Sequence, residues 1–323
     1  TIKRGSGDKL TVTYSKWMDC EYPIRVSNGE LIINQDVAFL KSASESYDTG
    51  WFGDYLKSLG KDPVGALEIT IPESMPLSGI TIQTCCNISV QDCKISGELL
   101  TATCGTYSLA NDAFGSVNIV TSSGEINADS CVSAGKFEAS TASGPIALID
   151  VSAGTLNLST ASGSINASNC KAATINAAAS SGPLMVENCA AESQINVSTA
   201  SGAIIASNCT SGKISAASAS APVTVENCAA GEIDAATTSG QIAVNDCAVK
   251  DLEIGTTSGG ADVKLAEAAG NYDVTFSTIT GKLYYNGAEA ASWNALNSPG
   301  AANKISFGSA SGSLSISDGQ RKA

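Results

Sequence analysis

Residues 156–189 read LNLSTASGSINASNCKAATINAAASSGPLMVENC, and this stretch contains two copies of one pattern. Each copy begins with an aliphatic residue, has a Ser-Gly step ending seven residues later, continues with an alternating aliphatic pair and ends on a cysteine. The glycines of the two copies, Gly163 and Gly182, are 19 residues apart. A fixed period of this length indicates that one structural unit is stacked on copies of itself.

The same Ser-Gly step returns at intervals of about 19 or 20 residues through the last two-thirds of the chain, and Ala221 occupies the one missing slot. The glycines of this glycine column are Gly124, Gly144, Gly163, Gly182, Gly202, Gly240, Gly259, Gly281 and Gly312. A glycine at a tight corner is expected either for a positive φ or because a Cβ has too little room. Ala221 indicates that at least one corner accepts a methyl group.

Aliphatic residues alternate with polar ones on both sides of each glycine, as in a strand with one buried face. The column seven residues before the glycine is apolar without exception: Val117, Phe137, Leu156, Ile175, Ile195, Ile214, Ile233, Leu252, Val274 and Ile305. The column two residues after it is also apolar: Ile126, Ile146, Ile165, Leu184, Ile204, Val223, Ile242, Ala261, Leu283 and Leu314. Strands this short cannot form a core alone, so the pattern predicts an all-β, single-stranded parallel β-solenoid (β-helix) with about one repeat per coil.

Cysteines form a further column, seven residues after the glycine. Its members are Cys131, Cys170, Cys189, Cys209, Cys228 and Cys247, with Val151 in the second coil and Ala266 after the last cysteine. One interpretation is a metal or redox ladder, and the other is a stack of small, buried, apolar thiols. The chain has no His and no CxxC pair, which favours buried free thiols, and we expect no metal and no cofactor. Asparagines directly before several of these cysteines suit a left-handed corner.

Composition limits the partners. The formal charge is −13, from 31 acids and 18 bases, and aromatic residues make up only 5%. Nucleic acids and anionic membrane surfaces are poor partners for such a chain, because binding them requires clustered Lys and Arg. No apolar run is long enough to span a bilayer. The odd count of 11 cysteines argues against a closed disulfide framework and, taken alone, allows a cytoplasmic protein.

Residues 1–65 are expected to form an N-terminal cap, and residues 66–319 the solenoid. The cap contains strand-like stretches at Lys9–Tyr14, Tyr22–Val26 and Glu30–Asn34, the last two joined as a hairpin, and an amphipathic helix is expected within residues 36–62. The solenoid begins with irregular coils that contain Cys85, Cys86, Cys93 and Cys104. An insertion near residues 288–302, with Trp293, is expected to cover the last coils, since solenoid ends expose strand edges.

The segment Leu67-Glu-Ile-Thr-Ile-Pro72, followed by Met75-Pro-Leu77 and then by Ser-Gly-x-Ile units, resembles a bacterial family of β-strand-repeat proteins of unknown function that are labelled adhesins. The resemblance covers roughly residues 66–319. It implies a parallel β-solenoid at the cell surface or secreted, and it supplies no catalytic or ligand-binding residues to transfer. The cysteine column and the insertion at 36–62 depart from the simple family pattern.

The first functional hypothesis is therefore a non-enzymatic surface module that displays a regular face to a protein or a glycan. The expected face contains two columns, which turn chemistry could also explain. The threonine column, three residues before the glycine, contains Thr121, Thr141, Thr160, Thr199, Thr237, Thr256 and Thr278. The serine column, one residue before the glycine, contains Ser123, Ser143, Ser162, Ser181, Ser201, Ser220, Ser239, Ser258 and Ser311. The oligomeric state is open, and a monomer is compatible with the sequence.

Two alternatives have less support. A polysaccharide-active β-helix enzyme would need convergent carboxylates, and the set Asp129, Glu187, Glu226 and Asp246 does not share one column. An ice-binding surface would need an unbroken threonine ladder, but Ala179, Ser218 and Ser309 interrupt it. The sequence therefore predicts no catalytic residues.

Overall fold

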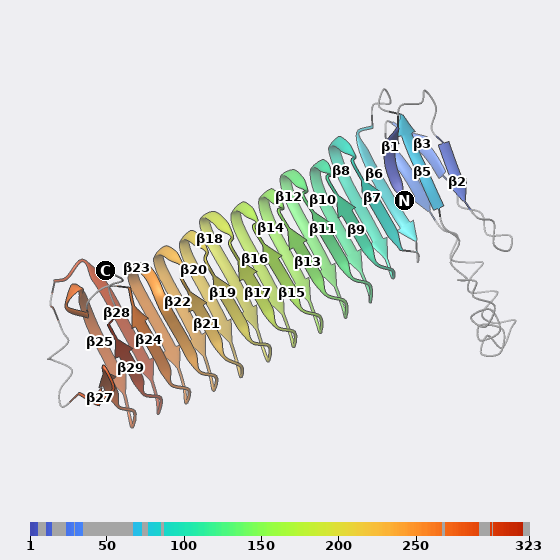
Figure 1. The fold of residues 1–323 in the computed structure, drawn as a ribbon. Helices are drawn as coiled ribbons and strands as arrows, with labels where there is room; N and C mark the ends of the chain where they lie inside the picture. Colours follow the sequence, from blue (N-terminus) through green and yellow to red (C-terminus); the bar gives the residue numbers. More distant parts are fainter. Residues whose placement is uncertain are drawn as a thin grey trace, which may run out of the picture.

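The computed structural model describes residues 1–5, 11–14, 24–28, 30–34, 67–72, 77–84, 87–266, 269–290, 298 and 300–318. In this part of the chain the protein is a rod of stacked coils, and each regular coil contributes one strand to each of two parallel sheets (Figure 1). This confirms the predicted parallel β-solenoid. The helical structure within the described residues is one short 3-10 turn, η1 (Ala269–Asn271), and no helix there is long and apolar enough to cross a membrane.

The two sheets are named A and B, and their strands are given in spatial order. Sheet B contains β3 (Ile24–Ser27), β4 (Glu30–Asn34), β6 (Gly79–Thr84), β8 (Lys94–Thr103), β10 (Ala113–Thr121), β12 (Val132–Thr141), β14 (Ser152–Thr160), β16 (Lys171–Ala179), β18 (Ala190–Thr199), β20 (Thr210–Ser218), β22 (Ala229–Thr237), β23 (Ile242–Thr256), β28 (Asn303–Ser309) and β25 (Tyr272–Thr278).

Sheet A contains β2 (Thr11–Tyr14), β5 (Leu67–Pro72), β1 (Ile2–Gly5), β7 (Ile88–Gln91), β9 (Tyr107–Ala110), β11 (Ile126–Asp129), β13 (Ile146–Ile149), β15 (Ile165–Ser168), β17 (Leu184–Glu187), β19 (Ile204–Ser207), β21 (Val223–Glu226), the first part of β23, β24 (Ala261–Leu265), β29 (Leu314–Ser317), β26 (Leu283–Tyr285) and β27 (Ala288–Glu289).

The aliphatic columns lie in register between coils. Ile175 of β16 pairs with Ile195 of β18, which pairs with Ile214 of β20, and all three are fully buried. In sheet A, Ile165 pairs with Leu184 in the same way. Because side chains alternate across a strand, these residues point into the space between the sheets while their neighbours point outward. Like side chains thus lie directly over one another and fill a narrow core.

Two corners of the coil have different chemistry. At one corner, the residue before the cysteine column has a left-handed backbone, with φ of 56° at Asn169 and 53° at Asn188, as the asparagines predicted. The same conformation occurs in earlier coils at Asp92, Asn111, Ser130 and Asp150. Asn and Asp adopt positive φ more readily than other non-Gly residues, which explains their frequency here.

At the other corner, the column glycines do not have positive φ; the positive-φ glycines among the described residues are Gly287 and Gly300. A Cβ on Gly163 would lie 1.8 Å from the carbonyl oxygen of Gly144 in the preceding coil. The close approach of successive backbones, and not a positive φ, therefore explains the glycine column, and Ala221 is the one column position that carries a methyl group.

The strand order at both ends departs from the sequence order. The last coil, β28 and β29, lies between the β23–β24 coil and the β25–β26 coil. At the other end, β1 lies between β5 and β7, so residues 1–5 are part of sheet A. The terminal strands therefore do not stack in sequence order, although the side-chain columns are kept.

The other terminal predictions have mixed outcomes. The hairpin of β3 and β4 is confirmed, with antiparallel pairing of Ile24 to Ile33. After the last cysteine, the register places Leu265 opposite Cys247 rather than the expected Ala266. The predicted helix at 36–62, Cys85, Cys86 and Trp293 lie outside the described residues, and the boundary between cap and solenoid near residue 65 stays a prediction.

Candidate functional site

The threonine column does not form a display surface. Thr121 is only 2% exposed and Thr256 only 8%. The Thr160 hydroxyl accepts a hydrogen bond from the Gly163 amide at 3.0 Å and donates one to the Gly144 carbonyl at 3.3 Å. The column thus closes each corner and joins it to the coil before, which is the turn chemistry that the sequence also allowed. An ice-binding array needs exposed threonines, so this burial contradicts that alternative.

The serine column is exposed along the same corner. The Ser123 hydroxyl donates to the Cys104 carbonyl at 3.2 Å, and the Ser258 hydroxyl donates to the Thr238 carbonyl at 3.3 Å. These serines also bond to the preceding coil. The column therefore contributes to stacking and is a weak candidate for ligand binding.

The cysteine column is buried and its thiols are free. Cys170, Cys189, Cys209 and Cys228 are at most 1% exposed. Two of these thiols accept a backbone N–H from the coil before: the Cys170 amide lies 3.3 Å from the Cys189 sulfur, and the Cys209 amide lies 3.4 Å from the Cys228 sulfur. Each also donates to the carbonyl two residues back, as Cys189 does to Glu187 at 3.2 Å. The sulfurs of Cys189 and Cys228 therefore do more than fill apolar space, because each satisfies a backbone amide at the corner.

A carboxylate occupies the same position in one coil. Asp112 is 1% exposed, and its carboxylate accepts the Cys93 amide at 2.8 Å and the Ala110 amide at 3.1 Å. The carboxylate therefore accepts the Cys93 backbone amide, just as the Cys189 and Cys228 sulfurs accept a backbone amide in later coils. Burial raises the pKa of Asp112 to about 6, although the two amides oppose this rise, and burial likewise raises the pKa of Cys131 to about 11. Thiols with raised pKa values are poor nucleophiles at neutral pH.

Within the part of the chain that the structure describes, no group of three or more Cys, Asp or Glu side chains is arranged to hold a metal ion. The thiols of the column lie one above another along the rod, whereas a structural zinc site needs four ligands around one centre. The side chains that face outward are therefore the remaining candidates for a functional site.

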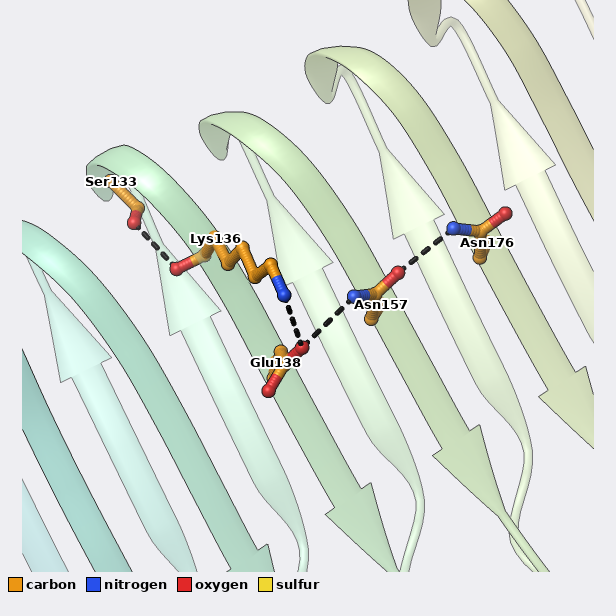
Figure 2. Close-up of polar contacts among 5 residues, drawn as sticks. All are labelled: Ser133, Lys136, Glu138, Asn157 and Asn176. Atoms are coloured by element: carbon orange, nitrogen blue, oxygen red, sulfur yellow. Dashed lines mark hydrogen bonds and ion pairs between the residues drawn. The ribbon is translucent and has the colours of Figure 1, made fainter.

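A polar ladder crosses the outer face of sheet B one residue after the first aliphatic column. The Asn196 side-chain amide donates to Asn176 at 2.8 Å, Asn176 donates to Asn157 at 2.8 Å, and Asn157 donates to the Glu138 carboxylate at 3.1 Å. Figure 2 shows the part of this chain that runs from Asn176 through Asn157 to Glu138 across successive strands. The three amides donate in the same direction, so the hydrogen bonds form one continuous chain that ends on the Glu138 carboxylate.

The ladder forms one side of a groove of about 320 Å³ over β10, β12, β14 and β16. The groove is lined by Asn118, Glu138, Ala139, Ser140, Asn157, Leu158, Ser159, Asn176 and Ala178. The hydroxyls of Ser140 and Ser159 lie 2.9 Å apart, and Lys136 approaches Glu138 at 3.8 Å between Nζ and Oε1 (Figure 2). Small residues leave the groove open, and amides and hydroxyls offer both donors and acceptors.

A second hollow of about 590 Å³ lies at the left-handed corner of the early coils. It is lined by Asp92, Lys94, Asn111, Asp112, Ala113, Ser130 and Val132. Three of these residues have positive φ and form the turns themselves, and the Asp112 carboxylate is engaged by backbone amides. The hollow is larger than the groove, but its only buried acid already has a structural role.

Carboxylates outside the groove follow another arrangement. Asp129, Glu187 and Glu226 occupy the same slot, five residues after the column position, while Asp246 lies one residue further. The four residues thus do not share one column, as expected, but three of them do. Ile149 and Ser168 separate Asp129 from Glu187, and Ser207 separates Glu187 from Glu226, so no two of the three acids that share this slot lie on adjacent coils.

The groove was not predicted from the sequence. The signal was present, because the slot after the first aliphatic residue contains Asn118, Glu138, Asn157, Asn176 and Asn196. It was missed because an outward polar residue is expected on any half-buried strand. Only the structure shows that these amides bond to one another and border a depression.

Comparison with protein families agrees with this architecture. The family model described as Toastrack DUF4097 matches residues 1–204 and 171–300. The chain belongs to the Toastrack family. No curated protein and no solved structure matches the chain. Toastrack membership and the solenoid fold together indicate a structural repeat module, and the β-repeat family of unknown function expected from the resemblance is confirmed at that level.

Proposed function

We propose that the protein is a non-enzymatic adhesin-type module at the cell surface, and that the groove on sheet B binds a glycan. The observation that carries this proposal is the ladder from Asn196 to Glu138, which borders an open groove on a rigid rod. The cell-surface location follows from the resemblance of Leu67–Pro72 and the Ser-Gly units to surface proteins.

The regular spacing of the coils supports a polymeric ligand. Asn157 and Asn176 occupy the same slot on adjacent strands, so equivalent amides recur about every 4.8 Å along the rod. Ser140 and Ser159 repeat in parallel with them. A ligand with repeating hydroxyl groups could make the same hydrogen bonds on successive coils, and several weak contacts on one rigid surface add to a useful affinity.

The shape of the site also favours a glycan over a folded protein partner. The groove is narrow and polar, and its apolar lining is limited to Ala139, Leu158 and Ala178; Ala139 and Leu158 are themselves buried. Protein interfaces usually have a core of aromatic or large apolar side chains. No aromatic residue lines the groove, and Leu158, its one large apolar lining residue, is buried. The amides and the carboxylate of the groove supply hydrogen-bond donors and acceptors for sugar hydroxyls.

The proposal is tested by probing the full chain on glycan arrays and host-matrix protein arrays, comparing wild type with Asn176→Ala. Asn166→Ala is the matched control, because Asn166 is an exposed asparagine on the outer face of sheet A in the neighbouring strand β15. We expect Asn176→Ala to lose glycan binding and Asn166→Ala to keep it. Equal binding by both variants, or binding by the wild type to matrix proteins alone, would refute the groove as a glycan site.

A polysaccharide-active enzyme stays the alternative, and the same preparation distinguishes it. Glycosidases generally use two carboxyl groups separated by roughly 5–9.5 Å, whereas the residues lining the groove include the single carboxylate Glu138. Incubation with each bound glycan, followed by analysis of reducing ends, should leave the glycan intact. Release of shorter products that is lost in Glu138→Gln would establish the enzyme instead.

A further inference from the structure

The last coil of the chain lies inside the stack instead of at its end. Strand β28 pairs with β23 on one side and with β25 on the other, and β29 pairs with β24 and β26 in the same way. The β25–β26 coil therefore joins the rest of the rod through the β28–β29 coil (Figure 1). The chain leaves a slot one coil wide after β24 and fills it with its last segment.

The slot and the last segment are closely complementary. Ile305 lies between Leu252 and Val274, and Phe307 lies between Ile254 and Phe276. The rings of Phe276 and Phe307 are stacked, with centroids 5.4 Å apart.

In sheet A, Leu314 lies between Ala261 and Leu283 and is fully buried. The segment therefore buries apolar side chains against both neighbours, as a coil in the middle of the rod does.

The segment also forms a complete corner. The Ser309 hydroxyl accepts the Gly312 amide at 2.6 Å and donates to the Thr257 carbonyl at 3.4 Å. At its end, the Asp318 amide donates to the Asn286 side chain at 3.1 Å, and Tyr285 donates to the Asp318 carboxylate. None of these contacts depends on the segment belonging to the same chain as the slot.

We propose that the slot also accepts the β28–β29 coil of a second copy of the chain, so that two copies exchange their last coils and join as a dimer. Exchange of an identical element recreates every native contact, which is why it is a low-cost route to dimers. The 13 residues between Glu289 and Asn303 connect the last coil to the rest of the chain and have a maximum reach of about 45 Å. The inference is independent of the ligand proposed for the groove.

The test uses the full wild-type chain in two forms, one unlabelled and one labelled with ¹⁵N. The two are unfolded, mixed in equal amounts, refolded over a range of protein concentrations, and separated into monomer and dimer. A carbodiimide then joins Lys304 of β28 to Asp251 of β23, which are register partners with exposed side chains, and mass spectrometry reports the isotopes of each cross-linked peptide pair.

We expect a dimer whose fraction rises with refolding concentration and in which about half of the Lys304–Asp251 cross-links combine one light and one heavy peptide, as random exchange requires. Lys213 and Glu232 provide the internal control, because their side chains are 2.6 Å apart within the middle of the rod and their cross-link must stay within one isotope. Lys304→Gln should remove the mixed cross-link and leave the dimer. Absence of a dimer at every concentration, or a dimer whose Lys304 cross-links are all of one isotope, would overturn the proposal.

Discussion

Replacing one buried isoleucine in the middle of the rod tests the stacked core quantitatively. Ile214 is fully buried and lies in register between Ile195 and Ile233. Changing Ile214→Ala removes three buried carbon atoms, and at about 0.8 kcal/mol for each this transfer contribution is roughly 2.4 kcal/mol. The cavity adds to that cost if the surroundings cannot close around it.

The solenoid should resist such closure. The backbone around the site is held by hydrogen bonds to the coils on both sides, for example from Thr210 to Cys189 at 3.0 Å and from Ala229 to Cys209 at 2.8 Å. The coils therefore cannot approach one another to fill the space. We expect Ile214→Ala to destabilise the fold by an amount in the upper half of the range of about 2–5 kcal/mol.

The assay is urea unfolding followed by far-UV circular dichroism, together with hydrogen exchange of the amides in β18, β20 and β22, since repeat proteins can unfold in parts. Ser215→Ala is the matched control, because Ser215 is the next residue on β20 and faces outward; it should change stability by less than about 0.5 kcal/mol. A loss below about 1 kcal/mol for Ile214→Ala would refute the argument from burial. Ile165→Ala, at the equivalent depth in sheet A, should behave in the same way.

Three further predictions concern the corners. Gly163→Ala should destabilise the rod by about 1–3 kcal/mol in urea titrations, because the new Cβ would clash with the backbone of the preceding coil. Gly255→Ala, whose Cβ would meet nothing within 4 Å, should be neutral or stabilising. Equal effects of the two substitutions would contradict the explanation by close backbone approach. Cys189 and Cys209 should react with a thiol reagent only after unfolding, and rapid labelling of the native chain would show that they are accessible. Burial raises the pKa of Asp112 to about 6 from 3.8, so the folded state binds this proton more tightly than the unfolded state does. Wild type should therefore gain stability relative to Asp112→Asn as pH falls from about 7 to 4. Parallel pH profiles of stability for the two proteins would argue against a buried carboxylate.

Much of the coil could be predicted from the sequence, because the apolar columns, the corner residues and the cysteine column all indicate the same stacked arrangement. An unbroken apolar column from Val117 to Ile305 left few ways to bury those residues other than stacking. The asparagines before the cysteines predicted the left-handed corner, where their φ values are positive. Burial of the cysteine column was predicted from Val151 at the same position, and that valine is fully buried.

Other features depend on contacts that periodicity does not encode. Val274 and Ile305 fit the same column equally well, so the pattern could not tell which coil lies next to Leu252. The threonine column lies at a corner, where alternation ends and the path of the backbone decides which side chains are covered. Asp112 was not assigned to the cysteine column because the regular spacing begins only after it. The groove depends on hydrogen bonds between outward side chains.

The central claim is that successive coils pair in parallel and in register, and through-hydrogen-bond scalar couplings between backbone ¹⁵N and ¹³C′ nuclei measure this most directly. The structure predicts couplings from the Ala190 amide to the Cys170 carbonyl, from Thr210 to Cys189 and from Ala229 to Cys209, with distances of 2.9, 3.0 and 2.8 Å. Each links a residue to the coil immediately before it, in the same direction. Couplings that instead connect these strands as antiparallel hairpins, or that skip coils in this region, would contradict the solenoid.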